Sequence, residues 1–155
     1  MSRDAGGPRY AAGVGASLVA EVVFIAVEAI VSLVRGMDPW MAARMPGALA
    51  LGPGAVQPPG FVPGDVAVGL LTHLGLGIVV GLVYAALLPR LGISPLVGGL
   101  IAGAVLYGLG FWLLPLLFPA WLAPFWVPPV EKGVQAATHA VYGVVFGWAY
   151  RRLAR

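Results

Sequence analysis

The sequence predicts an all-α, polytopic membrane protein with four transmembrane helices, built as two duplicated helical hairpins. Its composition, its long apolar stretches and an internal repeat predict this class. Hydrophobic residues make up 60% of the chain and charged residues only 10%, whereas about 25% of the residues of a soluble domain are charged. The chain therefore has the composition of a protein whose main solvent is lipid.

Four apolar stretches are each long enough to cross the hydrocarbon core, which takes about 20 helical residues. They cover residues 11–34, 66–88, 95–118 and 130–150. The first is too long for a signal peptide and has no cleavage motif close behind it, so we expect it to remain as a helix. We expect one transmembrane domain over residues 11–150, between a tail at 1–10 and a basic tail at 151–155.

A segment that occurs twice predicts the duplicated hairpins. Residues 63–84 and 129–150 align at an offset of 66 residues, with eight of 22 positions identical. The only two histidines of the sequence, His73 and His139, occupy equivalent places in this alignment. Because both repeats begin in the same compartment, the two halves are expected to form a parallel pseudo-repeat with its axis along the membrane normal.

Basic residues predict the orientation of the helices. Six of them fall on the side of the termini: Arg3, Arg9, Arg90, Arg151, Arg152 and Arg155. Three fall on the other side: Arg35, Arg44 and Lys132. This excess places both termini in the cytoplasm. Because the basic residues are scattered at segment ends, they favour a lipid bilayer as partner and argue against nucleic acid.

The external loop at residues 35–64 contains a predicted helix start at Asp38-Pro39, an N-cap followed by proline. Its apolar residues would form one face of a short helix lying in the membrane interface: Trp40, Met41, Met45, Leu49 and Leu51. The aromatic residues of the second external loop are expected to anchor it at the headgroups rather than to form a lid: Trp121, Phe125 and Trp126.

Glycines recur at a spacing of four within the apolar stretches. The pairs are Gly77 and Gly81, Gly99 and Gly103, and Gly143 and Gly147. Small residues at this spacing allow helix backbones to approach closely in lipid. They therefore predict tight helix packing.

Ionisable groups inside the apolar stretches predict a site. Glu21 and Glu28 are seven residues apart, so they share one face of the first helix. At about 1.5 Å per residue, Glu28 lies roughly 10 Å below the outer boundary, and His73 and His139 lie roughly 12 Å below it. Glu21 would lie deeper, near the midplane. Because such groups usually face the interior of a bundle, we expect the first three to meet at one level.

Three kinds of chemistry fit this group. His73, His139 and Glu28 could hold a divalent metal ion, and the two histidines could instead ligate haem or another tetrapyrrole. A proton relay is the third, with Glu21, Glu28 and the two histidines as carriers and Tyr84 or Tyr150 near the cytoplasmic exit. The alternative for each histidine is a hydrogen bond to a neighbouring helix, and for each tyrosine an anchor at the interface.

The pattern resembles the YagU-like small four-helix inner-membrane proteins of bacteria. The residues that carry the resemblance are Asp38-Pro39, the element from Thr72-His73 through Gly77 and Gly81 to Tyr84, and Thr138-His139 with Gly143 and Gly147. The resemblance implies a bacterial inner-membrane location. It implies no activity.

The first functional hypothesis is a non-enzymatic accessory or structural subunit of a larger membrane complex, with other subunits or further copies of the chain as partners. The second is a haem-, tetrapyrrole- or metal-binding protein that uses His73 and His139. The third is a proton-coupled transporter or channel that uses Glu21 and Glu28. No arrangement of residues predicts a catalytic nucleophile, and the absence of cysteine excludes thiolate metal sites.

Overall fold

The computed structural model describes residues 9–125 and 127–155, and within these residues all regular structure is helical. The predicted all-α class is confirmed. Arg3 and Trp126, which the sequence analysis singled out, lie outside the described residues.

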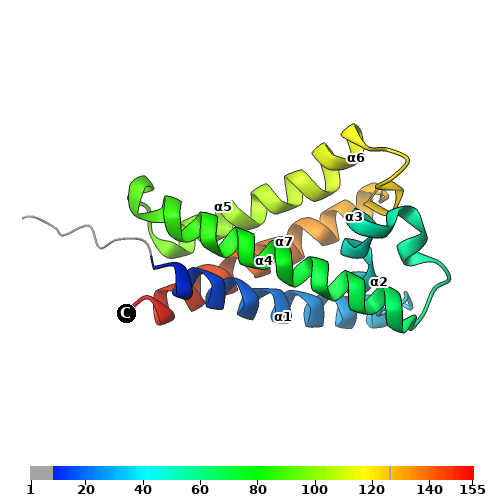
Figure 1. Cartoon of the computed structure of the whole chain (residues 1–155), viewed down its shortest axis with the longest axis horizontal. Helices are drawn as coiled ribbons and strands as arrows, with labels where there is room; N and C mark the ends of the chain where they lie inside the picture. The colour runs from blue at the N-terminus through cyan, green and yellow to red at the C-terminus, as the bar shows by residue number, and fades with distance from the viewer. Residues whose placement is uncertain (1–8, 126) are drawn as a thin grey trace, which may run out of the picture.

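Four long helical segments form the body of the protein (Figure 1). Three of them are α1 (Tyr10–Val34), α4 (Pro63–Leu91) and α7 (Pro129–Leu153). The remaining segment is continuous from Pro95 to Leu117 and consists of α5 (Pro95–Gly108), the π-helical turn η3 (Leu109–Leu113) and α6 (Leu114–Leu117). All four agree with the predicted stretches to within three residues at each end.

Among the described residues, three segments are long and apolar enough to cross a membrane: Tyr10–Val34, Pro63–Leu91 and Pro95–Leu117. Helix α7 is as long as α1, at 25 residues, but it is more polar. It carries Glu131 in its first turn and Arg151 and Arg152 in its last. Its inward side contributes Gln135 and Thr138, both buried.

The segments pack in the order α4, α1, α7, α5, since α1 contacts both α4 and α7, and α7 contacts α5. Helices α4 and α5 meet near the short turn that joins them, where the Tyr84 hydroxyl donates to the Pro95 carbonyl at 2.5 Å. Figure 1 shows α5 and α6 leaning away from α4 towards the opposite end. The axes of these helices therefore diverge towards that end.

Glycines bring the helix backbones into direct contact, as their spacing predicted. A Cβ atom on Gly81 would lie 2.6 Å from the carbonyl oxygen of Gly13, where α4 crosses α1. A Cβ atom on Gly143 would lie 2.6 Å from the carbonyl oxygen of Gly99, where α7 crosses α5. Each position has room for hydrogen only.

A cap formed by residues 38–56 covers the outer end of α4. It contains α2 (Met41–Arg44), η1 (Met45–Gly47), α3 (Ala48–Leu51) and η2 (Gly52–Val56). The predicted helix start is present, since an Asp38 carboxylate oxygen accepts from the Trp40 amide at 2.9 Å. The predicted interfacial helix differs from the structure, because the cap packs on α4 and α1 and its Met41, Met45 and Leu49 line an internal cavity.

Arg44 holds the cap together from inside. Its side chain has no exposed surface, and it donates to the carbonyls of Ala55 and Gly60 at 3.1 and 2.9 Å. It also reaches the carboxylate of Asp65, in the first turn of α4, at 3.3 Å. The sequence analysis counted Arg44 only as a loop charge and missed this role.

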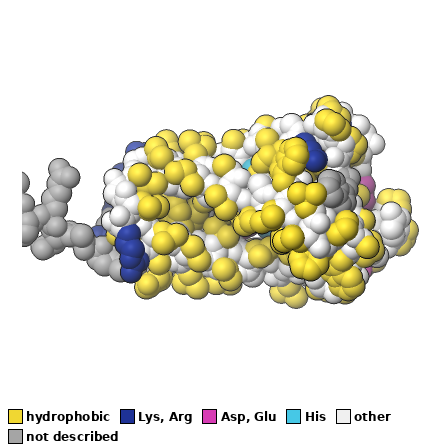
Figure 2. Space-filling model, turned by 90° about the horizontal axis from the view of Figure 1, so that it is seen from above, with side chains coloured by type: hydrophobic (Ala, Val, Ile, Leu, Met, Phe, Trp, Pro, Cys, Tyr) yellow, Lys and Arg dark blue, Asp and Glu magenta, His cyan; other side chains and the backbone are white. Residues whose placement is uncertain are grey.

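Hydrophobic side chains cover most of the surface seen in Figure 2. Basic side chains appear at the end where α1 begins and the chain ends, and acidic ones at the opposite end. The exposed apolar residues include Val22 of α1, Leu71 of α4, and Ile101 and Leu116 of the segment Pro95–Leu117. This is the surface expected for contact with lipid.

Candidate functional site

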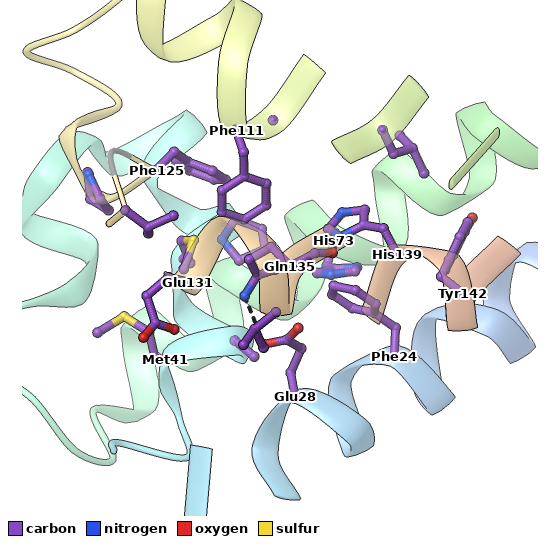
Figure 3. A pocket seen from close by; sticks show the side chains of 18 of the residues that line it. Phe24, Glu28, Met41, His73, Phe111, Phe125, Glu131, Gln135, His139 and Tyr142 are labelled. Atoms are coloured by element: carbon purple, nitrogen blue, oxygen red, sulfur yellow. Dashed lines mark hydrogen bonds between the residues drawn. The ribbon is translucent and has the colours of Figure 1, made fainter. Parts of the chain in front are cut away.

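A cavity of about 380 Å³ occupies the wider end of the bundle, beneath the cap. Its walls come from all four long segments, from the cap and from the second external loop. Most of the lining is apolar, and polar side chains are confined to a few positions on α1, α4 and α7 (Figure 3). Pockets of this kind, apolar with a few placed polar groups, are the usual form of small-molecule sites.

Both predicted histidines line this cavity. They lie on either side of Phe24, whose ring centroid is 5.6 Å from that of His73 and 4.8 Å from that of His139. His73 belongs to α4 and His139 to α7, and Phe24 comes from α1, which runs between those two helices. The prediction that the two imidazoles meet inside the bundle is therefore in agreement with the structure.

The Nδ1 atom of His73 touches the carboxylate of Glu21. Glu21 is buried, with 3% of its surface exposed, and the histidine side chain is 13% exposed. The contact forms where α1 and α4 cross, since Glu21 also lies directly over Gly77. A larger residue at Gly77 would displace the carboxylate, so this glycine makes room for the pair.

The Nδ1 atom of His139 lies 2.7 Å from the carbonyl oxygen of Gln135, one turn earlier on the same helix. A carbonyl oxygen can only accept a hydrogen bond, so Nδ1 must donate. In the neutral ring, the Nε2 atom of His139 then carries a lone pair and can accept. Histidines that bind metals or ligands are commonly held in this way, through their second nitrogen.

Glu28 is held by one oxygen only. Its Oε2 atom accepts from the side-chain amide of Gln135 at 3.0 Å, as Figure 3 shows. Its Oε1 atom has no hydrogen-bond partner among the described residues, although the residue is only 5% exposed. Gln135 was not predicted as a site residue. The sequence did offer a signal for it, because it is the one amide side chain on an apolar helix face.

The predicted common level of Glu28 and the two histidines needs correction. Glu21 is the carboxylate that meets an imidazole, whereas Glu28 lies about two helical turns further out on α1, beside Gln135. The predicted depth of Glu28 was counted along the helix from Arg35, and that of His73 from Asp65. Both residues were assumed to lie at the same outer boundary of the membrane. Asp65 instead lies beneath the cap, paired with the buried Arg44, so α4 begins deeper than the count assumed.

The predicted three-ligand metal site gains no support from this geometry. Within residues 9–125 and 127–155, no three histidine, aspartate or glutamate side chains lie close enough together to hold a metal ion. Two imidazoles remain available to a ligand of another kind.

The outer end of the cavity is closed by an ion pair between α1 and α7. Two nitrogens of Arg35 donate to the two carboxylate oxygens of Glu131, each at 2.5 Å. The hydrogen bond from Arg35 is the main cause that lowers the pKa of Glu131 below its ordinary value of 4.5. The same bond raises the pKa of Arg35. The positive charge of Arg35 and the negative charge of Glu131 therefore compensate each other.

The polar groups predicted as a proton relay do not form one continuous chain in the described residues. Below Glu21, the hydroxyls of Ser17 and Tyr142 share a hydrogen bond of 2.9 Å, which the sequence analysis missed. Tyr84 and Tyr150 lie further in, both buried and with ring centroids 5.0 Å apart, so neither is an interface anchor. The fully buried ring of Phe146 packs between Tyr142 and Tyr84 and separates the two groups.

The cavity is lined by residues that are also part of the outer surface between α4 and η3. Leu76 and Leu109 line it, yet they are 43% and 39% exposed. These residues lie where α4 and α5 diverge.

Fold and site together define a bundle of membrane-capable helices around a mostly apolar cavity, with a few polar side chains from α1, α4 and α7 in its wall. The chain matches no protein-family model, no curated protein and no solved structure. The function is therefore inferred from the polar side chains that line the cavity.

Proposed function

We propose that this chain is a four-span protein of the bacterial inner membrane that binds a small, largely apolar ligand or cofactor through His73 and His139. One observation carries the proposal. The two histidines, at equivalent positions of the two repeats, line the same cavity, and each has its Nδ1 atom already in contact with a protein partner. This leaves the Nε2 atoms for a bound molecule.

The fourth span is α7. Its length of 25 residues corresponds to about 38 Å, enough for the hydrocarbon core. It packs between α1 and α5, so lipid would surround it only in part. Its polar side chains Gln135, Thr138 and Tyr142 are buried, which explains how a less apolar helix is accommodated. At equivalent positions of the repeat, Gly81 of α4 lies against the backbone of Gly13 in α1, and Gly147 of α7 lies against the backbone of Pro95 in α5, which supports a duplicated hairpin.

The test is ligand retention by purified protein. We expect protein extracted in mild detergent to carry a bound molecule that native mass spectrometry detects as a fixed mass increment. The variants His73→Ala and His139→Ala should lose it. Thr72→Val is the matched control, because Thr72 bonds only to the Val68 carbonyl of its own helix and does not line the cavity.

An optical spectrum of the same sample distinguishes the kinds of ligand. An absorption band that both histidine variants abolish would identify haem or another tetrapyrrole. A colourless sample with a bound organic mass would identify a ligand without such a chromophore. Protein without any bound molecule, and unable to take one up from lipid, would refute the proposal.

An accessory role in a larger membrane complex is compatible with this function, as is kinship with YagU-like proteins. The accessory role is supported by the apolar surface and the glycine-rich helices, and the kinship only by the sequence motifs that carry the resemblance. Proton-coupled transport by Glu21 and Glu28 has less support, because Phe146 interrupts the polar groups below Glu21.

A further inference from the structure

We infer that the ligand of this cavity is a protonated amine with an apolar body, and that Glu28 is its counter-charge. This inference rests on the proposed function, since it names the chemical class of the ligand that the same cavity would hold.

The unpartnered oxygen of Glu28 is the first argument. The Oε1 atom lacks a hydrogen bond among the described residues, and the side chain lines the cavity at 5% exposure. Buried polar atoms in folded proteins almost always have a partner, because leaving one unpaired is costly. A ligand that donates a hydrogen bond at this place would supply the missing partner.

The charged side chains that line the cavity indicate the sign of the ligand's charge. Its ionisable lining consists of Glu21, Glu28, Arg35, His73, Glu131, His139 and Tyr142. Arg35 and Glu131 hold each other by two hydrogen bonds, and Glu21 is in contact with His73. Of the three carboxylates, Glu28 is the one whose hydrogen bond comes from a neutral group, the Gln135 amide, and Arg35 acts on it only through the electrostatic field while its own hydrogen bonds go to Glu131. A cation would therefore be compensated here, and an anion would be repelled.

His139 adds a second acceptor to the same wall. Its Nδ1 atom donates to the Gln135 carbonyl, so the Nε2 atom of the neutral ring accepts. Gln135 links the two groups, because its carbonyl holds His139 while its side chain holds Glu28. The polar part of the cavity thus offers two acceptors, the Oε1 atom of Glu28 and the Nε2 atom of His139.

An ammonium group fits these acceptors better than a metal ion does. A metal needs several ligand atoms at about 2.0–2.6 Å from one point, and the described residues contain no such cluster of three. An ammonium has three donors that reach separate acceptors at ordinary hydrogen-bond distances. The rings of Phe24 and Phe111, which contact His139 from two sides, add faces that attract a cation.

The apolar remainder of the cavity explains why the amine needs an apolar body. Leucines and methionines of α4, η3 and the cap contribute to this wall: Leu76, Leu109, Met41, Met45 and Leu49. Methionine side chains adapt their shape to different apolar groups. A purely polar amine would leave this wall unfilled.

The experiment compares three probes with one skeleton: 4-phenylbutylamine, 4-phenylbutanol and 4-phenylbutanoate. At neutral pH the amine is a cation, because its pKa is close to that of lysine. Binding of radiolabelled probe to the full chain in lipid nanodiscs is measured by equilibrium dialysis, with empty nanodiscs subtracted. We expect the amine to bind at least about tenfold more tightly than the alcohol, as charge-assisted hydrogen bonds imply.

The variant Glu28→Gln separates the inference from the proposed function. It keeps the shape of the side chain and removes its charge, so the preference for the amine over the alcohol should fall to about one while the alcohol still binds. Retained alcohol binding also shows that the variant is folded. In Glu28→Asp, which keeps the charge on a shorter side chain, the preference should be partly retained.

Each other outcome has a defined meaning. Equal binding of amine and alcohol by the unaltered protein, or an amine preference that survives in Glu28→Gln, would overturn the inference and leave the proposed function standing. Tightest binding of 4-phenylbutanoate would overturn it as well. Failure of all three probes to bind would overturn the inference and count against the proposed function.

Discussion

At the scale of single residues, the contact between Glu21 and His73 joins two helices inside the bundle. Removing one partner leaves the other buried without compensation, which is more costly than removing both. Hydrogen bonds between transmembrane helices measured by double-mutant cycles average about 0.6 kcal/mol and reach about 1.7 kcal/mol. Because both groups here are ionisable and largely buried, we expect a value near the upper end of that range.

The measurement is a double-mutant cycle with Glu21→Gln, His73→Asn and the double variant, using reversible unfolding in mixed micelles. The predicted coupling energy is about 1–2 kcal/mol. A parallel cycle on Ser17→Ala and Tyr142→Phe gives the reference for a neutral hydrogen bond. Additive effects of Glu21→Gln and His73→Asn would show that the two side chains do not interact.

The ion pair of Arg35 and Glu131 predicts a dependence of stability on pH. The pKa of Glu131 is lower in the folded protein than its ordinary value of 4.5. Its contribution to stability is therefore complete above about pH 4.5 and is lost as the pH falls through the lower, folded pKa. Because the pair is partly exposed, at the end of α1 and in the first turn of α7, the contribution should be small and weakened by salt.

Thermal unfolding of the unaltered protein and of Glu131→Gln between pH 6 and pH 3 measures this contribution. The two melting temperatures should converge as the pH falls, and their difference at pH 6 should shrink in 1 M salt. A difference that is unchanged at pH 3 would mean that the carboxylate charge is not the cause.

At the scale of the helical elements, the glycine contacts between α1 and α4 decide how closely the helices approach. A Cβ atom on Gly81 would meet backbone atoms of Gly13, which cannot move aside as a side chain can. We expect Gly81→Ala to destabilise the protein by about 1–3 kcal/mol, the usual cost of overpacking. Gly75→Ala is the matched control, because nothing lies within 4 Å of a Cβ atom there.

Gly75 lies on the same helix, less than two turns from Gly81. Alanine forms helices better than glycine by about 1 kcal/mol, so Gly75→Ala should leave the stability unchanged or raise it. Equal destabilisation by both substitutions would show that helix propensity, rather than the contact with α1, determines the effect.

The helices were predictable because length and apolar composition are local properties of the sequence. Their ends agree closely with the predicted stretches. The direction of the cap was not predictable, because the buried position of Arg44 depends on carbonyls of Ala55 and Gly60, more than ten residues away. The shared cavity of His73 and His139 was predictable from the repeat. The partner of His73 was not, since it depends on how far α4 is displaced along α1.

At the scale of the whole molecule, the two ends of the bundle differ in charge. Arg90, Arg151 and Arg152 lie at one end, and the cap and the Arg35–Glu131 pair lie at the other. An excess of basic residues marks the cytoplasmic side. We therefore expect the cap to face away from the cytoplasm and all four long segments to span the membrane.

The absence of cysteine makes this topology simple to measure. Single cysteines introduced at Gly54 in the cap and at Arg155 in the final tail can be tested in intact cells with a maleimide that does not cross membranes. Gly54→Cys should react in intact cells, and Arg155→Cys only after lysis. Reaction of both in intact cells would show an odd number of spans.

The central claim is that His73 and His139 meet in one ligand-binding cavity, with Nε2 of His139 as an acceptor. Because the chain has only two histidines, ¹⁵N labelling of histidine gives an NMR spectrum with two imidazole rings, which His73→Asn assigns. We predict that neutral His139 carries its proton on Nδ1, and that signals of both rings shift when 4-phenylbutylamine is added in nanodiscs. A proton on Nε2 of neutral His139, or signals of both rings that the amine leaves unmoved, would contradict the claim.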